Sequence, residues 1–495
     1  MAPTRRRHAL SELYPQRRER KPAARLGYRS RRWVPPTLAG LNRAQMELAR
    51  TLDGPVLALA GPGTGKTRTI VTRMAWAIES GHTPAHAILA TTFTVDAAGE
   101  MRERVAALVG RHAAEAITIT TLNSLGWMIV RRDQDRLGFK NVRVAPALAR
   151  EIVAELIEAM ELDDTAARDL DAAAVLERIA AFKVLGIAPE AAPDAWPAVA
   201  ARVDGRAPPD GTEAAGDTLA WRVAAAVYGR YVRAMRDEDA VDYADQCTLA
   251  VQLLSEHADL RDHWRDRFRL VMVDEFQDSD PAQWALIRLL AGEGADANLC
   301  CIGDDDQTLY PWRLADPAHI TRFEDWYATV RVIELDVNYR SGAAIVAAAS
   351  RLIAHNQQRR AKTIRPTDGN GAGEVATLAA ETLPGLATQI ARDILARGPG
   401  RRLLLARTNH AGALAGGVLA AHGIPVANTA PLVSDALDHA MAAASLALDP
   451  DALTDALRVA QRLPDLDPAI LERARKARGA AGDALDRLAA AAGED

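Results

Sequence analysis

Short, continuous apolar runs recur between residues 56 and 302, and each is followed by polar residues. The runs cover residues 56–59, 87–92, 270–273 and 299–302. Their length and composition predict strands that are buried on both faces of a parallel sheet. Open sheets of this kind bind ligands at the carboxyl ends of their strands, which is where the polar residues stand. The pattern therefore predicts an α/β fold with a functional site at that edge.

The hydrophobic pattern changes twice along the chain. Between residues 126 and 235, Ala-rich helical periodicity with Pro-rich interruptions predicts a helical insertion in the first sheet domain. From residue 341 we expect a second α/β unit, with strands at 375–378 and 403–406. The predicted domains are a basic, disordered tail (1–36), the first sheet domain (37–125 and 236–340), the helical insertion (126–235), a partial second α/β domain (341–430) and a final helical segment (431–495).

Composition is that of a globular protein with a large core, because 49% of the 495 residues are hydrophobic and 25% are charged. No run approaches the roughly 18 apolar residues of a membrane span, so we expect no membrane partner. Cys247, Cys300 and Cys301 lack metal-ligand spacing. They fit reduced core positions in a cytoplasmic protein.

Positive charge is concentrated in the first residues. Residues 1–33 hold 11 Arg and Lys against Glu12 and Glu19, whereas the whole chain has a net charge of −5. The tail lacks apolar periodicity, which predicts disorder, and it lacks the apolar segment of a secretory signal. Two interpretations stay open: a basic arm that contacts nucleic acid, or non-native residues that come from an incorrectly assigned start codon.

A glycine-rich segment separates the first predicted strand from a predicted helix. Residues 60–67 read Ala-Gly-Pro-Gly-Thr-Gly-Lys-Thr, which follows the phosphate-loop pattern G-x-x-x-x-G-K-[ST] except that alanine replaces the first glycine. The glycines let backbone N–H groups face phosphate, the lysine reaches the β- and γ-phosphates, and the last threonine ligates Mg²⁺. The residues expected at this ATP and Mg²⁺ site are Gly61, Gly63, Thr64, Gly65, Lys66 and Thr67.

Three further motifs complete a predicted hydrolysis site, and the first two follow predicted strands. Asp274 and Glu275 follow the third run; Asp274 is suited to hold Mg²⁺ and Glu275 to orient the attacking water as a general base. Gln307 can sense the γ-phosphate without competing for the metal. Tyr339 can stack on adenine, and Arg340 can stabilise charge in the transition state. The predicted catalytic residues are Lys66, Glu275, Gln307 and Arg340.

In this order the motifs resemble the UvrD/Rep/PcrA family of superfamily 1 DNA helicases, from about residue 41 to about residue 426. Other segments similar to the family are Leu41-Asn42-Arg43-Ala44-Gln45, Thr92-Phe93-Thr94, Val241-Asp242-Tyr243 and Leu404-Leu405-Ala406-Arg407-Thr408-Asn409. The resemblance implies a P-loop NTPase whose RecA-like motor domain carries the helical insertion, followed by a partial second RecA-like domain. It also implies an ATP-dependent helicase or translocase of 3′→5′ polarity that binds single-stranded DNA and single-strand/double-strand junctions.

The resemblance assigns further contacts. Gln45 would read adenine, and Arg68 would lie beside the phosphates. The residues implied at single-stranded DNA are Phe93, Asn123, Tyr310, Trp312 and Arg407. Aromatic side chains suit this role because stacking on a base tolerates any sequence. For Phe93 and Trp312 a place in the hydrophobic core stays open as an alternative.

The chain also departs from the family pattern. Val95-Asp96 replaces the usual Asn-Lys, which should weaken contact with a DNA backbone. Asn123 replaces a histidine, and Pro311 replaces a glycine before the stacking tryptophan. The fifth and sixth motifs, which supply a second arginine finger, are not found. We therefore expect a truncated motor that binds ATP but translocates processively only if another chain supplies the missing half.

Two functions of different classes stay open. The first is an ATP-dependent DNA helicase. The second is an ATP-gated accessory subunit that binds single-stranded DNA but does not unwind DNA alone. A P-loop kinase would leave Gln307 and the Tyr339–Arg340 pair without a role, so we set it aside.

Overall fold

The computed structural model describes residues 35–160, 170–204, 216–309, 313–357 and 359–427. The chain divides into two compact units, Met1–Glu374 and Val375–Asp495. The predictions for the basic tail, Tyr310, Pro311, Trp312 and the segment 431–495 lie outside the described residues. None of the described helices is both long and apolar enough to cross a membrane.

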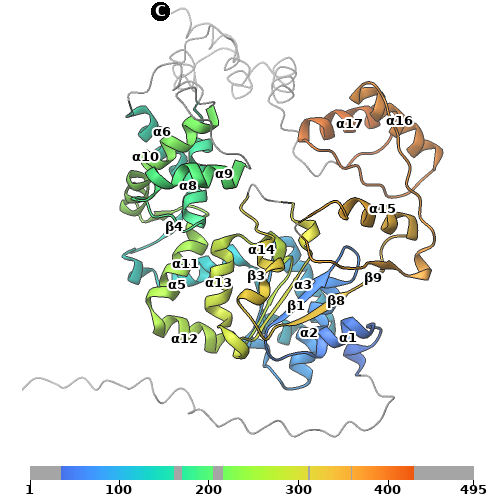
Figure 1. The fold of residues 1–495 in the computed structure, drawn as a ribbon, viewed down its shortest axis with the longest axis horizontal. Coiled ribbons are helices and arrows are strands. Elements are labelled where there is room, and N and C mark those ends of the chain that lie inside the picture. The colour runs from blue at the N-terminus through green and yellow to red at the C-terminus, as the bar shows by residue number, and fades with distance from the viewer. Residues whose placement is uncertain (1–34, 161–169, 205–215, 310–312, 358, 428–495) are drawn as a thin grey trace, which may run out of the picture. The chain divides into compact units, whose positions relative to one another are not determined.

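The first unit is built on a six-stranded, fully parallel sheet (Figure 1), which confirms the predicted α/β fold. The strand order is β3-β2-β6-β7-β1-β8. The strands are β1 (Val56–Ala60), β2 (Ile88–Thr92), β3 (Thr118–Thr121), β6 (Leu270–Val273), β7 (Leu299–Gly303) and β8 (Arg331–Leu335). The four predicted strands are confirmed as β1, β2, β6 and β7, and they occupy the interior of the sheet. The two strands that the sequence did not predict, β3 and β8, lie at its edges.

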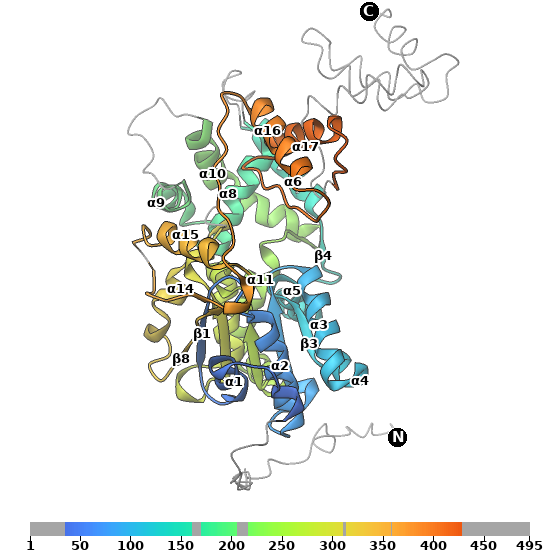
Figure 2. The same cartoon turned by 90° about the vertical axis from the view of Figure 1, so that its right-hand side faces the viewer.

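Alternating side chains divide the core between the two faces of the sheet. Val56, Ala58 and Ala60 of β1 pack on one face, against helices that Figure 2 shows beside the strands. These helices are α1 (Arg43–Arg50), α2 (Lys66–Glu79), α3 (Val95–Val109) and α4 (Arg111–Ala116). Leu57 and Leu59 pack on the other face. The helices there are α5 (Leu122–Arg132), α11 (Asp245–Glu256), α12 (Ala258–Arg267), α13 (Pro281–Ala291) and α14 (Ala318–Thr321).

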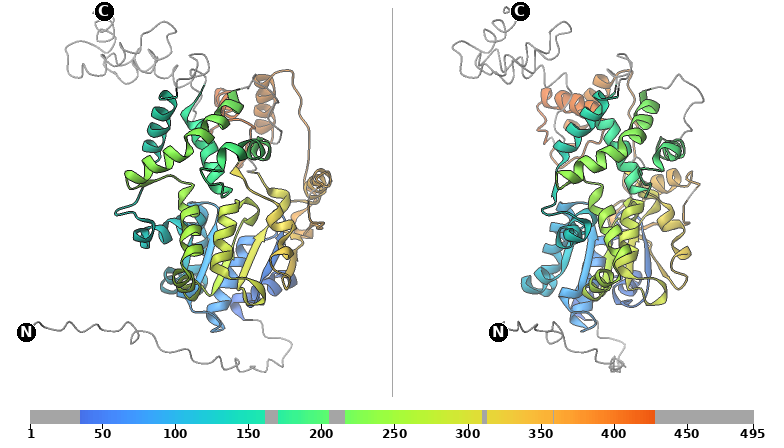
Figure 3. Two further views of the ribbon diagram at one scale, coloured as in Figure 1. Left: turned by 60° about the vertical axis from the view of Figure 1, so that its left-hand side comes forward. Right: turned by 90° about the vertical axis from the view of Figure 1, so that its left-hand side faces the viewer.

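A separate hydrophobic cluster holds four of the described helices between β3 and β6 (Figure 3). They are α6 (Pro146–Glu158), α8 (Ala172–Val184), α9 (Ala192–Asp204) and α10 (Gly216–Asp237). Two short parallel strands, β4 (Arg143–Val144) and β5 (Ala240–Val241), pair at the entrance and exit of this segment. Lys183 is buried here and contacts the carboxylates of Asp242 and Asp245 at 2.7 Å each.

After β8, the first unit continues with β9 (Val337–Asn338), α15 (Ala343–Ile353) and β10 (Arg365–Pro366), and β10 pairs with β9 in parallel. The described part of the second unit contains α16 (Leu383–Ala396) and α17 (Asn409–Ala421). The predicted strands at 375–378 and 403–406 are wrong for this structure, because neither segment forms a strand. Leu403 and Leu405 are 81% and 82% exposed. An apolar run becomes a strand only where a neighbouring strand takes up its backbone N–H and C=O groups. The second RecA-like domain therefore stays a prediction.

Candidate active site

The phosphate loop begins where β1 ends and finishes at the first residue of α2. Gly63 and Gly65 have φ angles of +71° and +83°, a region that side-chain-bearing residues rarely adopt. A Cβ at Gly63 would lie 2.7 Å from Cβ of Arg340, and one at Gly65 would lie 2.8 Å from Nε2 of Gln45. Ala60 belongs to β1 and its side chain is buried in the core, so the departure from the glycine pattern is accommodated inside the sheet.

Four consecutive carbonyl oxygens of the loop, from residue 61 to residue 64, accept hydrogen bonds. Thr64 Oγ1 donates to Gly61 O at 2.8 Å, and Gln45 Nε2 donates to Thr64 O at 2.9 Å. Asn338 Nδ2 donates to Pro62 O at 2.7 Å, and the Tyr339 N–H donates to Gly63 O at 2.8 Å. These bonds hold the loop carbonyls against the protein, which suits a loop that offers its N–H groups and the N-terminus of α2 to an anion.

Lys66 and Glu275 meet across the ends of β1 and β6. Lys66 Nζ lies 2.9 Å from Glu275 Oε2, and Gln277 Nε2 donates to the same oxygen at 2.9 Å. Glu275 adopts a φ of +49°, an uncommon conformation that side-chain-bearing residues retain chiefly at functional sites. The two residues predicted to act on the γ-phosphate and on water are therefore in direct contact.

Asp274 is the buried carboxyl group at the end of β6. Burial, followed by the charge of Glu275, raises the pKa of Asp274 to about 7, although the Lys66 charge opposes this. Mg²⁺ in nucleotide sites is held by one or two carboxylates together with phosphate and water oxygens, and Asp274 offers such a carboxylate. Thr67 is the second residue of α2, and its joint role with Asp274 at Mg²⁺ stays a prediction. A bound cation would favour the ionised form of Asp274.

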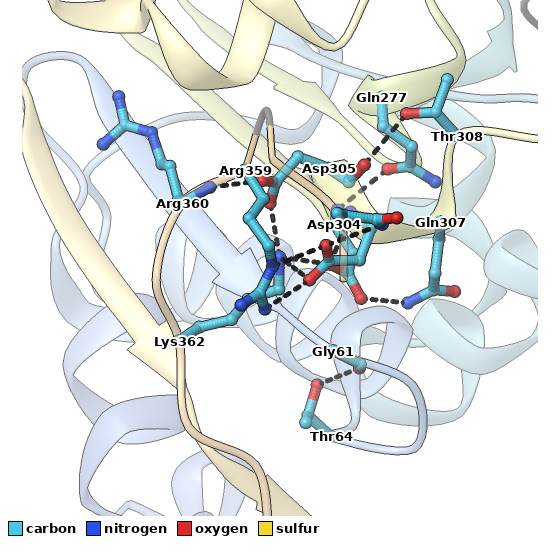
Figure 4. Close-up of polar contacts among 12 residues, drawn as sticks. Gly61, Thr64, Gln277, Asp304, Asp305, Gln307, Thr308, Arg359, Arg360 and Lys362 are labelled. Carbon is cyan, nitrogen blue, oxygen red and sulfur yellow. Dashed lines mark hydrogen bonds and ion pairs between the residues drawn. The ribbon is translucent and has the colours of Figure 1, made fainter. Parts of the chain in front are cut away.

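The end of β7 brings Gln307 to the same edge (Figure 4). Gln307 Nε2 donates to Asp304 Oδ2 at 2.6 Å. The backbone N–H of Asp304 donates to Gln277 Oε1 at 3.1 Å. Because Gln277 also contacts Glu275, one hydrogen-bonded chain runs from Gln307 to the Lys66–Glu275 pair.

The predicted adenine contacts lie at the start of α1 and after β9. Tyr339 is 45% exposed, and its hydroxyl accepts a hydrogen bond from Asn42 Nδ2 at 2.9 Å. Gln45 is buried, and its amide contacts the Asn42 N–H and the Thr64 carbonyl. The structure thus gives Gln45 a part in supporting the loop, and its reading of adenine stays a prediction. Arg68 is exposed and lies beside Gly40.

A cleft of about 230 Å³ adjoins the residues that are predicted to act in hydrolysis. Phe93 and Asn123, which were predicted to touch DNA, line it together with Asp274 and Glu275. The Arg313 guanidinium lies over the Phe93 ring, 5.4 Å from its centroid. Residues predicted to contact DNA and residues predicted to act on the attacking water therefore line the same cleft.

Local structure accounts for two of the departures in this region. Asn123 Oδ1 accepts a hydrogen bond from Gln283 Nε2 at 2.8 Å, so its amide is oriented within the cleft. Asp96 stands in the first turn of α3, where a negative charge stabilises the helix N-terminus. Arg407 belongs to the second unit, and its role at DNA stays a prediction.

Sequence reasoning missed four residues at this site. Asn338 and Gln277 were given no role, although Asn338 donates to the Pro62 carbonyl and Gln277 joins Glu275 to Asp304. Arg359 and Lys362 were not considered, yet both contact the aspartates after β7 (Figure 4). A basic Arg-Arg-x-Lys run shortly after the segment that forms α15 was the available signal.

Comparisons with known proteins agree with this geometry. A family model described as the UvrD/REP helicase N-terminal domain matches residues 41–328. The chain is similar to "ATP-dependent DNA helicase PcrA" of Staphylococcus epidermidis, at 31% identity over 333 residues, which are 67% of this chain and 42% of that protein. The same figures hold for the protein of that name from Staphylococcus aureus.

The matched region contains the phosphate loop, β6 and its acidic end, and β7 with Gln307, and it ends before Tyr339 and Arg340. The chain spans less than half the length of these curated relatives. With a family model that covers more than half of its residues, and with the site assembled as described above, this chain belongs to the UvrD/REP helicase family.

Proposed function

We propose that this chain hydrolyses ATP and couples hydrolysis to movement on single-stranded DNA, as an ATP-dependent DNA helicase or translocase. The observation that carries the proposal is the chain of contacts that links Gln307, through Asp304 and Gln277, to the Lys66–Glu275 pair, beside a loop whose carbonyls are held against the protein. The relatives named ATP-dependent DNA helicases support it. The 3′→5′ polarity and the use of junctions rest on family resemblance.

The phosphates would bind at the loop N–H groups and the N-terminus of α2. Lys66 now neutralises Glu275, and a γ-phosphate would compete for its ammonium group. Drawing Lys66 toward the phosphate would leave the Glu275 carboxylate available to orient a water and accept its proton. Thr67 and Asp274 would hold Mg²⁺, which when bound neutralises charge on the phosphate oxygens.

Nucleotide recognition would use the surface between α1 and the segment after β9. The exposed Tyr339 ring would stack on adenine, with Asn42 fixing its hydroxyl. Arg340 is exposed and its Cβ lies against Gly63, so its guanidinium is within reach of the phosphates. As an always-charged, bidentate donor it would stabilise the transition state.

Single-stranded DNA would enter the cleft lined by Phe93 and Asn123. Because Asp274 and Glu275 border that cleft, a strand bound there would change the surroundings of the water-orienting carboxylate. This arrangement supports stimulation of hydrolysis by DNA. Any contribution of Tyr310, Trp312, Arg407 or a second chain is part of the proposal, as is a cytoplasmic location.

The proposal is tested by steady-state ATP hydrolysis with and without oligo(dT). Lys66→Ala removes the phosphate-binding cation, whereas Lys140→Ala replaces an exposed lysine and serves as its control. We expect DNA-stimulated turnover in the wild type and in Lys140→Ala and its loss in Lys66→Ala. Binding of ATP and oligo(dT) without turnover would instead favour the accessory subunit. An enzyme that binds no nucleotide would refute both functions.

A further inference from the structure

The segment 359–364, here named the strap, lies against the aspartates that follow β7 (Figure 4). Lys362 Nζ contacts Asp304 Oδ1 and Asp306 Oδ2 at 2.7 Å each, and it also contacts Asp305. Arg359 donates through two nitrogens to the two oxygens of Asp306, at 2.8 Å each. Further along the strap, Ile364 occupies the space where a Cβ of Gly61 would lie. The strap thus touches both the aspartates and the phosphate loop.

The three carboxylates are buried, and the chain itself supplies their positive partners. The side chain of Lys362 is 5% exposed, and those of Asp304, Asp305 and Asp306 are 1%, 0% and 5% exposed. Their oxygens lie close enough together to suit a metal ion, but the Lys362 ammonium group already contacts all three residues. Buried charges are tolerated only when they are paired and hydrogen-bonded, so the ion cluster depends on Lys362.

Asp304 connects this cluster to the hydrolysis residues. One oxygen of its carboxylate contacts Lys362, and the other accepts the hydrogen bond from Gln307 Nε2 at 2.6 Å. Its backbone N–H contacts Gln277, whose amide reaches Glu275. The orientation of the Gln307 amide therefore depends on a carboxylate that Lys362 holds from the opposite side.

We propose that Lys362 is a positioning residue for recognition of the γ-phosphate, acting through Asp304 on Gln307. The inference rests on the proposed ATPase function. Without the ammonium group, three buried carboxylates repel one another and the turn from Asp304 to Gln307 rearranges. Gln307 then loses its fixed orientation toward the phosphate loop. Recognition of the β-phosphate by the loop itself is unaffected, because the loop carbonyls keep their partners Gln45 and Asn338.

The test compares Lys362→Met with Lys362→Arg and with a matched control, Lys183→Met. Lys183 is also a buried lysine between two carboxylates. Its partners Asp242 and Asp245 follow β5, at the exit of the inserted helices, and do not belong to the aspartates after β7. Dissociation constants for ADP and for ATPγS, both with Mg²⁺, are measured with each variant, together with kcat and KM for ATP. The ratio of the two dissociation constants reports recognition of the third phosphate.

We expect Lys362→Met to lower the preference for ATPγS over ADP roughly tenfold, the effect of losing a charge-assisted contact. ADP binding should stay within about twofold of wild type, and kcat should fall more than KM rises. Lys362→Arg should recover part of the preference. Lys183→Met should lower the melting temperature without changing the ratio. An unchanged ratio in Lys362→Met, or an equal change in Lys183→Met, would overturn the inference.

Two further measurements keep the inference testable. If Lys362→Met does not fold, Arg359→Gln removes the bonds to Asp306 and should give a smaller loss of the same preference; no loss contradicts the proposal. The second measurement is the rate of amide hydrogen exchange in the peptide 303–308, without nucleotide, in Lys362→Met and Lys183→Met. If Lys362→Met does not fold, Arg359→Gln takes its place. Faster exchange in this peptide when a strap contact is lost, but not in Lys183→Met, supports the positioning role of Lys362. This holds even if the wild type binds no nucleotide, in which case the proposed function alone fails. Unchanged exchange refutes the positioning role.

Discussion

Asn338→Ala tests how the phosphate loop is held, because this side chain joins the loop to the segment after β9. Asn338 is 3% exposed. Its Oδ1 accepts the N–H groups of Arg340 and Ser341 at 2.8 Å each, and its Nδ2 donates to Pro62 O at 2.7 Å. Alanine removes all three bonds. The turn that carries Tyr339 and Arg340 then loses its side-chain link to the loop and keeps the backbone bond from the Tyr339 N–H to Gly63 O.

The size of the effect follows from the number of bonds. A hydrogen bond contributes about 1 kcal/mol net, and a buried polar group left without a partner costs about 1–3 kcal/mol. Three lost bonds at a buried position therefore predict a decrease of roughly 3–5 kcal/mol in the free energy of unfolding of the first unit. Because the loop also loses a fixed partner, we expect ATPγS to bind about tenfold more weakly.

Denaturant unfolding and ATPγS titration measure both quantities. Asn298→Ala is a matched control, because the Asn298 amide donates to the Arg269 carbonyl at 2.9 Å and has no contact with the phosphate loop. Asn298→Ala should lower the free energy of unfolding by about 1 kcal/mol and leave ATPγS affinity unchanged. If Asn338→Ala unfolds as the control does and binds ATPγS as the wild type does, the hydrogen bonds of Asn338 do not hold the loop.

Three other substitutions test catalysis, packing and pH dependence. Glu275→Gln should lower kcat for ATP by about 10²–10⁴ while ATPγS affinity stays within about threefold, and a kcat within tenfold of wild type contradicts a general base. Gly126→Ala should cost about 3 kcal/mol in denaturant unfolding, because its Cβ would overlap the Gln246 carbonyl, whereas Gly99→Ala, in open space on α3, should be neutral or stabilising. Burial lowers the pKa of His319 from 6.5 to about 4. As the pH falls, the imidazole of the unfolded chain binds a proton before that of the folded chain. Between pH 6.5 and 4 the free energy of unfolding of the wild type should therefore fall by up to about 3 kcal/mol relative to that of His319→Phe, and parallel profiles of unfolding free energy against pH would exclude this.

The interior of the sheet could be predicted because buried strands carry a continuous apolar signal. The runs that became β1, β2, β6 and β7 have neighbours on both sides and helices on both faces. Since the carboxyl ends of parallel strands share one edge, the residues after them could also be expected to meet. The contact between Lys66 and Glu275 agrees with that reasoning.

Edge strands and long-range ion pairs could not be predicted in the same way. β3 reads Thr-Ile-Thr-Thr, and β8 exposes Arg331, Val332 and Glu334, so neither has the pattern of a buried strand. The run at 403–406 has an apolar pattern like β1 but remains exposed, because local pattern does not supply a neighbour. The contact of Lys362 with Asp304 joins positions that lie far apart in the chain, and nothing local specifies it.

The position of β1 in the sheet has a consequence for synthesis on the ribosome. β1 is the first of the described strands to be made, but its partners β7 and β8 begin about 240 and 270 residues later. At about 5–20 residues per second, the apolar segment Val56–Ala60 waits roughly 12–50 s for its first neighbour. During that time the nascent chain has no complete nucleotide site and exposes an unpaired, apolar strand segment. Chaperone binding to the growing chain should therefore persist until β7 has emerged.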